Sequence, residues 1–131
     1  MSSFSDYTEA AVLNHVFRAT ALPSPASVRL ALFTAAPTDA GGGTEVSGGG
    51  YARQPVTFGA PAADGASMKI ANSAAVAYTA AGAAFGTVVA VGYFDAPTGG
   101  NMLAWSPITS AAIGDGDSLS FPVGQLTITL T

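Results

Sequence analysis

From residue 28 onward the chain alternates apolar and polar side chains over short segments, which are separated by turns rich in glycine and proline. The clearest example is residues 126–131, where leucine and isoleucine alternate with threonine. In residues 28–33 the strand period places Val28, Leu30 and Leu32 on one face and Arg29, Ala31 and Phe33 on the other. A period of two is typical of half-buried β-strands. Short strands at this spacing usually pack as sandwiches or small barrels. We therefore predict a mainly β fold of about seven antiparallel strands, forming a sandwich or a compact barrel-like domain.

The place of each strand follows from the apolar segments and the turn residues between them. We expect strands at residues 28–33, 51–58, 68–78, 87–94, 102–108, 118–123 and 125–131. Residues 87–94 are apolar on both faces, which indicates a central strand. Pro55 has no backbone N–H to donate, so its strand should lie at a sheet edge or at a bulge. Residues 95–100 have the composition of a hairpin turn, which should pair the strands on either side.

The first segment has helical spacing instead, and we predict a short α-helix over residues 6–19. Asp6 is a suitable N-cap, and Glu9 completes a capping-box pattern. Pro23 and Pro25 then force an extended link. Four side chains at spacings of three and four form the apolar face of the helix: Tyr7, Ala10, Leu13 and Phe17. Because a helix of this length is not stable alone, it must dock on its own sheet or on a neighbour.

Two runs of three glycines lie in an expected loop over residues 37–50. A loop so long and so permissive is usually either mobile or moulded against a partner. A phosphate-binding loop would continue with Gly-Lys-Ser/Thr, whereas Tyr51 follows the second run. Glu45 and Arg53 could anchor the two ends of the loop on the subunit or reach a neighbour. Internal anchoring is the slightly favoured interpretation, because surface ion pairs contribute only about 0–1 kcal/mol.

Charge is scarce for a chain of 131 residues. Only 9% of the residues are Asp, Glu, Lys or Arg, against about 25% in a typical soluble domain. Charged surface normally keeps a small protein soluble and separate, so we infer that neighbouring subunits cover much of this one. The net charge of −4 without a basic patch argues against nucleic-acid binding. We expect one domain over residues 1–131, without a signal peptide or a membrane span.

Few residues suggest chemistry, and each has a simpler structural interpretation. His15 is the only histidine, and no convergent partner is implied for catalysis or metal binding. Asp115 and Asp117 resemble the start of a calcium loop, but Leu126 stands where a bidentate glutamate is needed. A turn is the better interpretation. Trp105 is the only tryptophan that could stack on a sugar. We therefore expect no catalytic residue, no cofactor and no metal site.

Four parts of the chain form a series in a fixed order: residues 13–34, 44–58, 85–103 and 117–124. Together they resemble a family of small bacteriophage proteins usually labelled tail fibre proteins. Phe85-Gly86 stands where that family has a Trp-Gly pair, which keeps an aromatic ring and should not change the fold. The resemblance implies a non-enzymatic structural protein of the virion, made in the host bacterial cytoplasm, and it brings no catalytic residues with it.

Three roles fit this resemblance. The first is a tail- or neck-associated fibre or adaptor component, and the second is a capsid decoration protein on the outer capsid lattice. The third is a receptor- or glycan-binding module with Trp105 and Tyr93 in a shallow site. Expected partners are tail, neck or major capsid proteins and further copies of the chain, with a trimer expected by analogy with other phage surface proteins. The candidate subunit-contact residues are Tyr7, Leu13, Phe17, Glu45, Tyr51, Arg53 and Trp105.

Overall fold

The computed structural model describes residues 3–131. In chain order its elements are β1 (Ser3–Phe4), α1 (Asp6–Arg18), β2 (Val28–Ala35), β3 (Thr44–Glu45), β4 (Gln54–Val56), β5 (Ala62–Asp64), β6 (Ser67–Ala71), β7 (Val76–Thr79), β8 (Gly86–Phe94), β9 (Met102–Ile113), β10 (Ser118–Phe121) and β11 (Thr127–Leu130). The prediction of a mainly β, sandwich-like domain with an N-terminal helix is confirmed. Among the described residues the sheets do not close into a barrel, and they contain more strands than expected because several strands are very short.

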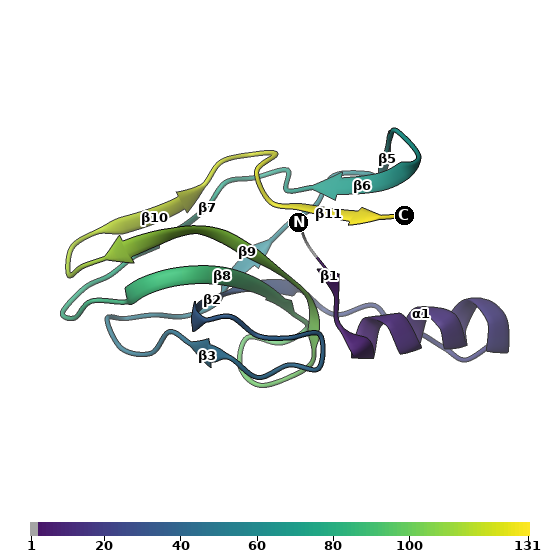
Figure 1. Cartoon of the computed structure of the whole chain (residues 1–131), viewed down its shortest axis with the longest axis horizontal. Coiled ribbons are helices and arrows are strands. Elements are labelled where there is room, and N and C mark those ends of the chain that lie inside the picture. Colours follow the sequence, from purple (N-terminus) through teal and green to yellow (C-terminus); the bar gives the residue numbers. More distant parts are fainter. Residues whose placement is uncertain (1–2) are drawn as a thin grey trace.

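The main sheet is antiparallel and has the order β1-β9-β8-β2-β3, with β4 also paired to β2 (Figure 1). The apolar strand β8 lies between β9 and β2, which confirms its predicted central place. It forms the predicted hairpin with β9, in which Phe94 faces Met102. Pro55 lies on β4 and faces Arg29 on β2. Within residues 3–131, β4 pairs only with β2, so Pro55 lies at a sheet edge as predicted. The expected strand over 51–58 is reduced to three residues, with Pro55 at its centre.

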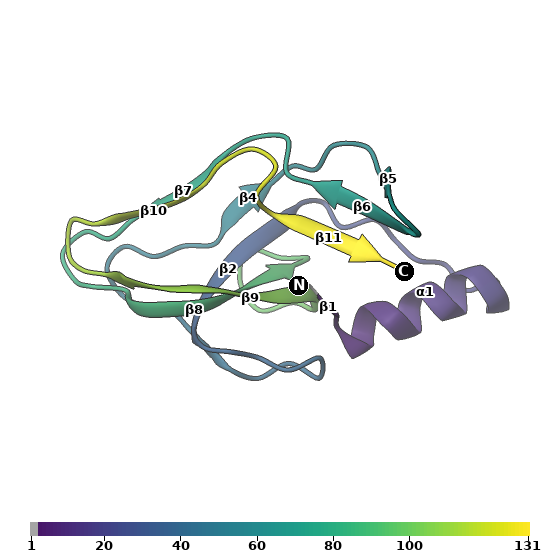
Figure 2. The same ribbon diagram turned by 45° about the horizontal axis from the view of Figure 1, so that its top comes forward.

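Two smaller antiparallel sheets cover one face of the main sheet. One pairs β7 with β10, and the other has the order β11-β6-β5 (Figure 2). The single strand predicted over 68–78 is wrong: residues 67–71 and 76–79 belong to different sheets, because the chain turns at buried Asn72. The main core between these layers contains Leu30, Leu32, Val76, Tyr78, Val88, Val91, Tyr93, Phe121 and Leu126.

Strand β2 is buried on both faces, whereas a period of two alone indicates a half-buried strand. Leu30 and Leu32 enter the main core. Ala31 and Phe33 point the other way and pack with Ala90, Phe94 and Trp105 in a second cluster. A strand buried on both faces organises two layers at once, so β2 and its neighbour β8 form the centre of the fold.

Helix α1 begins at the predicted residue 6, but its N-cap differs from the prediction and it ends one residue earlier than predicted. The N-cap is Ser5, not Asp6: the backbone N–H of Thr8 donates to the Ser5 hydroxyl at 3.2 Å. The helix ends at Arg18, and Ala19 caps it in the left-handed region at φ 53°. Ser5 is also buried and donates to the Met102 carbonyl oxygen, so the cap fastens the start of the helix to β9.

The glycine-rich segment 37–50 packs against its own subunit. Its Val46 is buried, and the backbone N–H of Val46 donates to the Leu32 carbonyl oxygen at 2.9 Å. Part of the expected loop is strand β3, which pairs with β2. Gly49 has φ +60°, and a Cβ placed there would lie 2.6 Å from the Ala83 carbonyl oxygen. Glycine is required at this position by both backbone conformation and space.

Replacing Gly49 with alanine should lower the free energy of unfolding by about 2–4 kcal/mol, since the left-handed conformation and the close carbonyl both penalise a methyl group. Gly48 is the matched control. It has φ +80°, but a Cβ there would meet nothing within 4 Å, so Gly48→Ala should cost only about 1 kcal/mol. Urea unfolding followed by tryptophan fluorescence measures both. Equal losses in the two variants would contradict the packing described for Gly49.

Candidate functional site

Exposed apolar side chains gather at one end of the molecule. Among the described residues, seven of the eight large exposed hydrophobic side chains lie on α1, on the link after it, or on β6 and β11. They are Tyr7, Leu13, Val16, Phe17, Leu22, Met68 and Leu130. The eighth, Val123, lies between β10 and β11. We call the group of seven the apolar end.

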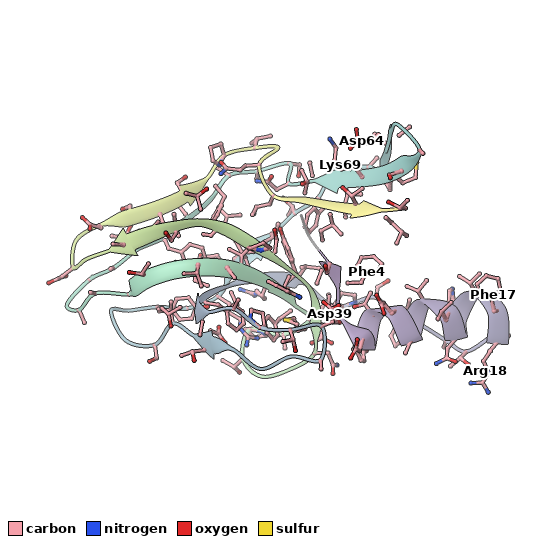
Figure 3. All side chains as sticks on the ribbon, viewed as in Figure 1. Phe4, Phe17, Arg18, Asp39, Asp64 and Lys69 are labelled. Atoms are coloured by element: carbon pink, nitrogen blue, oxygen red, sulfur yellow. The ribbon has the colours of Figure 1, made fainter. Side chains whose placement is uncertain are left out.

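The helical stripe predicted from the sequence is at the centre of the apolar end and is uncovered. Phe17 is 78% exposed and Leu13 is 57% exposed. Figure 3 shows Phe17 and Arg18 at the tip of α1 that projects beyond the sheets. The helix contacts its own subunit through its first turns, where the Thr8 hydroxyl donates to the Leu103 carbonyl oxygen at 2.7 Å. The sequence left open whether the helix docks on its own sheet or on a neighbour. Docking on its own sheet covers only the start of α1.

A groove of about 500 Å³ runs between α1, the proline link and the β6–β11 pair. Its walls are mostly apolar and include Phe4, Tyr7, Leu22, Phe58, Ile70 and Ile128. Ile70 and Ile128 face each other across the β6–β11 ladder, and Met68 faces Leu130 one step further out. Side chains two residues apart share a sheet face, so this face continues the groove wall to the exposed Met68 and Leu130.

Tyr93 lies at the base of this groove and is only 1% exposed. Burial raises the pKa of its phenol above the ordinary value of 10.0, so the ring stays neutral at physiological pH. The ring packs against Phe58 with centroids 5.8 Å apart. Tyr93 is thus a core residue that shapes the groove rather than an acid or base.

Glu45, Tyr51 and Arg53 form a separate network away from the apolar end. The Arg53 Nε and Nη2 atoms donate to Glu45 Oε2 and Oε1 at 2.9 and 2.8 Å. Arg53 Nη1 donates to the carbonyl oxygens of Ala96 and Gly99 at 3.0 and 2.8 Å. The guanidinium also lies 3.8 Å above the Phe94 ring. This arrangement is the internal anchoring that the sequence favoured, extended to the turn between β8 and β9.

The hydroxyl of Tyr51 completes the network. It donates to Glu45 Oε2 at 2.7 Å and accepts the backbone N–H of Leu32 at 3.1 Å. Partial burial acts to raise the pKa of Glu45, but the hydrogen bonds from Arg53 and Tyr51 outweigh it, and the pKa lies below the ordinary 4.5. Burial and the bond to Glu45 raise the pKa of Tyr51. The network therefore holds one fixed ionised pair and a neutral phenol.

The lowered pKa of Glu45 predicts a pH dependence of stability. An acid whose folded pKa is depressed stabilises the fold above its unfolded pKa, and this contribution is lost as the pH falls through the folded value. Wild type should therefore be more stable than Glu45→Gln at pH 7, and the gap should narrow below about pH 4.5. Urea unfolding of both proteins between pH 7 and pH 3 measures this. A gap that widens on acidification would contradict the assignment.

Trp105 lies on the opposite face of the main sheet from Tyr93. It packs with the second cluster, and its indole Nε1–H donates to Asp39 Oδ1 at 2.9 Å. The backbone oxygen of the same Asp39 accepts the N–H of Asp6 at 2.9 Å, so Asp39 ties the loop to the helix start. Tyr93 points into the main core instead. The structure does not bring Trp105 and Tyr93 into one shallow site.

The residues considered for chemistry have structural partners. The Asp117 carboxylate accepts the N–H of Gly114 at 2.8 Å, as in the turn that the sequence predicts. The Asp115 carboxylate instead accepts the N–H of Gly82, in another loop, at 2.9 Å. His15 Nδ1 lies 3.0 Å from the Thr20 carbonyl oxygen. Within residues 3–131 no group of three His, Cys, Asp or Glu side chains could hold a metal ion. In the same range no helix has the length and apolarity needed to cross a membrane.

The seven candidate contact residues thus fall into three places. Tyr7, Leu13 and Phe17 lie on α1, the Glu45 network lies beside the β8–β9 turn, and Trp105 lies on the far face of the main sheet. Sequence reasoning missed Asn72 and Ser5, whose buried side chains join distant strands. The sequence offers no signal for either contact, because Asn72 falls inside the strand predicted over 68–78 and the partners of Ser5 lie far along the chain.

Comparison with known proteins identifies the family of this β-rich chain. No curated protein matches the sequence. A family model described as Podophage GP4 fiber I protein gp80 matches residues 3–129. This match covers nearly all of the described chain, including the Glu45 network and the apolar end apart from Leu130. The chain therefore belongs to the Podophage GP4 fiber I protein gp80 family, a family of phage fibre proteins.

Proposed function

We propose that the chain is a non-enzymatic structural subunit of the virion that attaches to the tail or neck as a fibre or adaptor component. Membership of a phage fibre family supports the virion role. The observation that carries the mode of action is the apolar end, where Phe17, Val16 and Leu13 are more than half exposed. Large exposed apolar patches mark interaction sites in soluble proteins. The subunit therefore works by packing against other virion proteins and against further copies of itself.

The rest of the surface supports a structural rather than a chemical role. The carboxylates of Asp95 and Asp117 each accept a backbone N–H within their own turn, and that of Asp115 accepts the N–H of Gly82 from another loop. Glu45 is committed to Arg53. Catalysis by paired carboxylates needs two free acids across a cleft. A polar pocket is lined by Asp6, Asp39 and Glu45, but Asp39 accepts the indole N–H of Trp105 and Glu45 is paired with Arg53.

Counting the chain in purified particles tests this proposal. Quantitative mass spectrometry should find the protein in particles at roughly tens of copies or fewer, since a tail or neck offers few attachment points. A count in the hundreds would instead identify a capsid decoration protein. Absence from particles that carry the other structural proteins would overturn the virion role itself.

A further inference from the structure

We propose that the apolar end is a self-association surface, on which helix α1 of one subunit packs antiparallel against helix α1 of a second copy. The inference rests on the proposed function and deepens it by naming the surface, the partner and the orientation. The exposed apolar face of α1 forms the centre of this contact. A short helix with an apolar face needs a partner for that face, and its own sheet covers only the first turns.

The area available at the apolar end matches what a stable pair needs. With ordinary side-chain areas, the seven exposed fractions amount to about 700 Å² of apolar surface. A standard stable interface buries about 800 Å² on each partner. The largest patch on a typical monomer is about 300–600 Å². The exposed apolar area of the apolar end is therefore larger than the largest patch on a typical monomer, and it approaches the area that one partner buries in a stable dimer.

Charge favours a second copy as the occupant. The elements that form the apolar end carry Asp6 and Glu9 against Arg18 and Lys69, so their formal net charge is zero. The net charge of −4 therefore lies on the rest of the chain. Two copies that meet through the apolar end therefore bring their least charged parts together and keep their acidic parts apart.

Charge within α1 sets the orientation. Its first turn carries Asp6 and Glu9, and its last turn carries His15 and Arg18. In an antiparallel pair each acidic turn lies beside the basic turn of the other copy, and the two helix dipoles oppose each other. A parallel bundle would place like charges together. The two-fold pair is therefore favoured over the trimer expected from the sequence.

The groove then receives the tip of the second helix. An antiparallel arrangement brings the last turn of one α1, with Phe17, beside the first turn of the other, where Tyr7 lines the groove. Phe17 is the most exposed large hydrophobic side chain among the described residues. Aromatic side chains seated in apolar pockets commonly dominate binding energy. Phe17 is thus the expected anchor of the contact.

The test measures the mass of the purified full-length chain by light scattering and sedimentation. Wild type at tens of micromolar should have about twice the mass of one 12.9 kDa chain. Phe17→Asp and Leu13→Asp should each weaken association at least about 100-fold. Val123→Asp is the matched control, because Val123 is 63% exposed but lies outside the apolar end. Thermal unfolding of each variant checks that the fold is kept.

Cysteine pairs test the orientation, because the chain contains no cysteine. Asp6→Cys and Arg18→Cys leave the apolar stripe unchanged. With a short bis-maleimide, an antiparallel pair should cross-link only when the two variants are mixed. Cross-linking of each variant alone would show a parallel arrangement and overturn the two-fold pair.

The other possible results of these measurements also test the self-association. A monomeric wild type, a threefold mass, or association that survives Phe17→Asp would each overturn the proposal. If wild type is monomeric in isolation but Phe17→Asp is lost from particles, another virion protein occupies the surface. In that case the self-association fails while the proposed function stands, since copy counting in particles tests the function separately.

Discussion

Replacing Arg53 with methionine is expected to lower the free energy of unfolding by about 3 kcal/mol, which is the lower end of the cost of breaking a buried ion pair. Methionine keeps the apolar stem but removes every donor. The Glu45 carboxylate, whose side chain is 28% exposed, would lose its partner. The carbonyl oxygens of Ala96 and Gly99 would lose theirs as well. The partial exposure of Glu45 lets water recover some of the loss, so the upper end of the range is not expected.

Lys69→Met is the matched control for this prediction. Lys69 lies 3.7 Å from Asp64, and both side chains are well exposed, at 39% and 54%. An exposed pair of this kind contributes about 0–1 kcal/mol. Urea unfolding followed by fluorescence should therefore separate the two variants clearly. Adding Glu45→Gln to Arg53→Met should recover part of the loss, because the unpaired charge is then removed. Equal small losses in both single variants would contradict a stabilising role for Arg53.

The features that sequence predicted well are those set by neighbours along the chain. The alternation in β2 separates Leu30 and Leu32 from Ala31 and Phe33, and the structure confirms the two faces. The turn between β8 and β9 was also predicted correctly. The Asp95 carboxylate closes this turn by accepting the N–H of Asn101 at 2.7 Å. Such contacts depend on side chains within a few residues of each other.

The spacing of apolar residues in helix α1 predicts its apolar face but not the partner of that face. The spacing of Tyr7, Leu13 and Phe17 predicts a shared face correctly, but spacing carries no information about what covers that face. The observed contacts of α1 instead use Ser5 and Thr8, whose partners are carbonyl oxygens of residues 102 and 103. Those bonds join residues nearly a hundred positions apart, so the sequence offered no signal for them.

The Glu45 network could be predicted from the sequence only in part. The pairing of Glu45 with Arg53 was a possibility because opposite charges flank a permissive loop. The further bonds from Arg53 to the β8–β9 turn depend on the fold, since β4 and β8 both pair with β2 and so bring that turn close. Sequence could therefore suggest the ion pair but not its burial, and burial is the property that makes Arg53 important.

Asn72→Asp is expected to cost at least about 3 kcal/mol at pH 7, because it places a charge beside two carbonyl oxygens in a buried site. Asn72 is 2% exposed. Its Nδ2 donates to the carbonyl oxygens of Ala74 and Pro122 at 2.9 and 3.0 Å, and its Oδ1 accepts the N–H of Leu126 at 2.9 Å. Aspartate keeps the shape and the acceptor, but ionised aspartate has nothing to donate.

The loss should shrink on acidification. Burial and two facing carbonyl oxygens raise the folded pKa of an aspartate at this position, so its destabilising effect is largest above that pKa and is relieved as the pH falls and the acid becomes a donor. Asn14→Asp, the same change beside Arg18 on α1, should be neutral within about 0.5 kcal/mol. Urea unfolding at pH 7 and pH 4 distinguishes the two, and a pH-independent loss at Asn72 would contradict the donor role.

The position of Asn72 connects this stability effect to assembly. It lies between β6 and β7 and holds the segment that leads from β10 into β11. The β6–β11 pair carries Met68 and Leu130, which belong to the apolar end. Loosening Asn72 should therefore release the β5–β6–β11 sheet before the main sheet unfolds. Hydrogen exchange of Asn72→Asp should show faster exchange in β6 and β11 than in β8, because local opening needs fewer broken contacts than global unfolding.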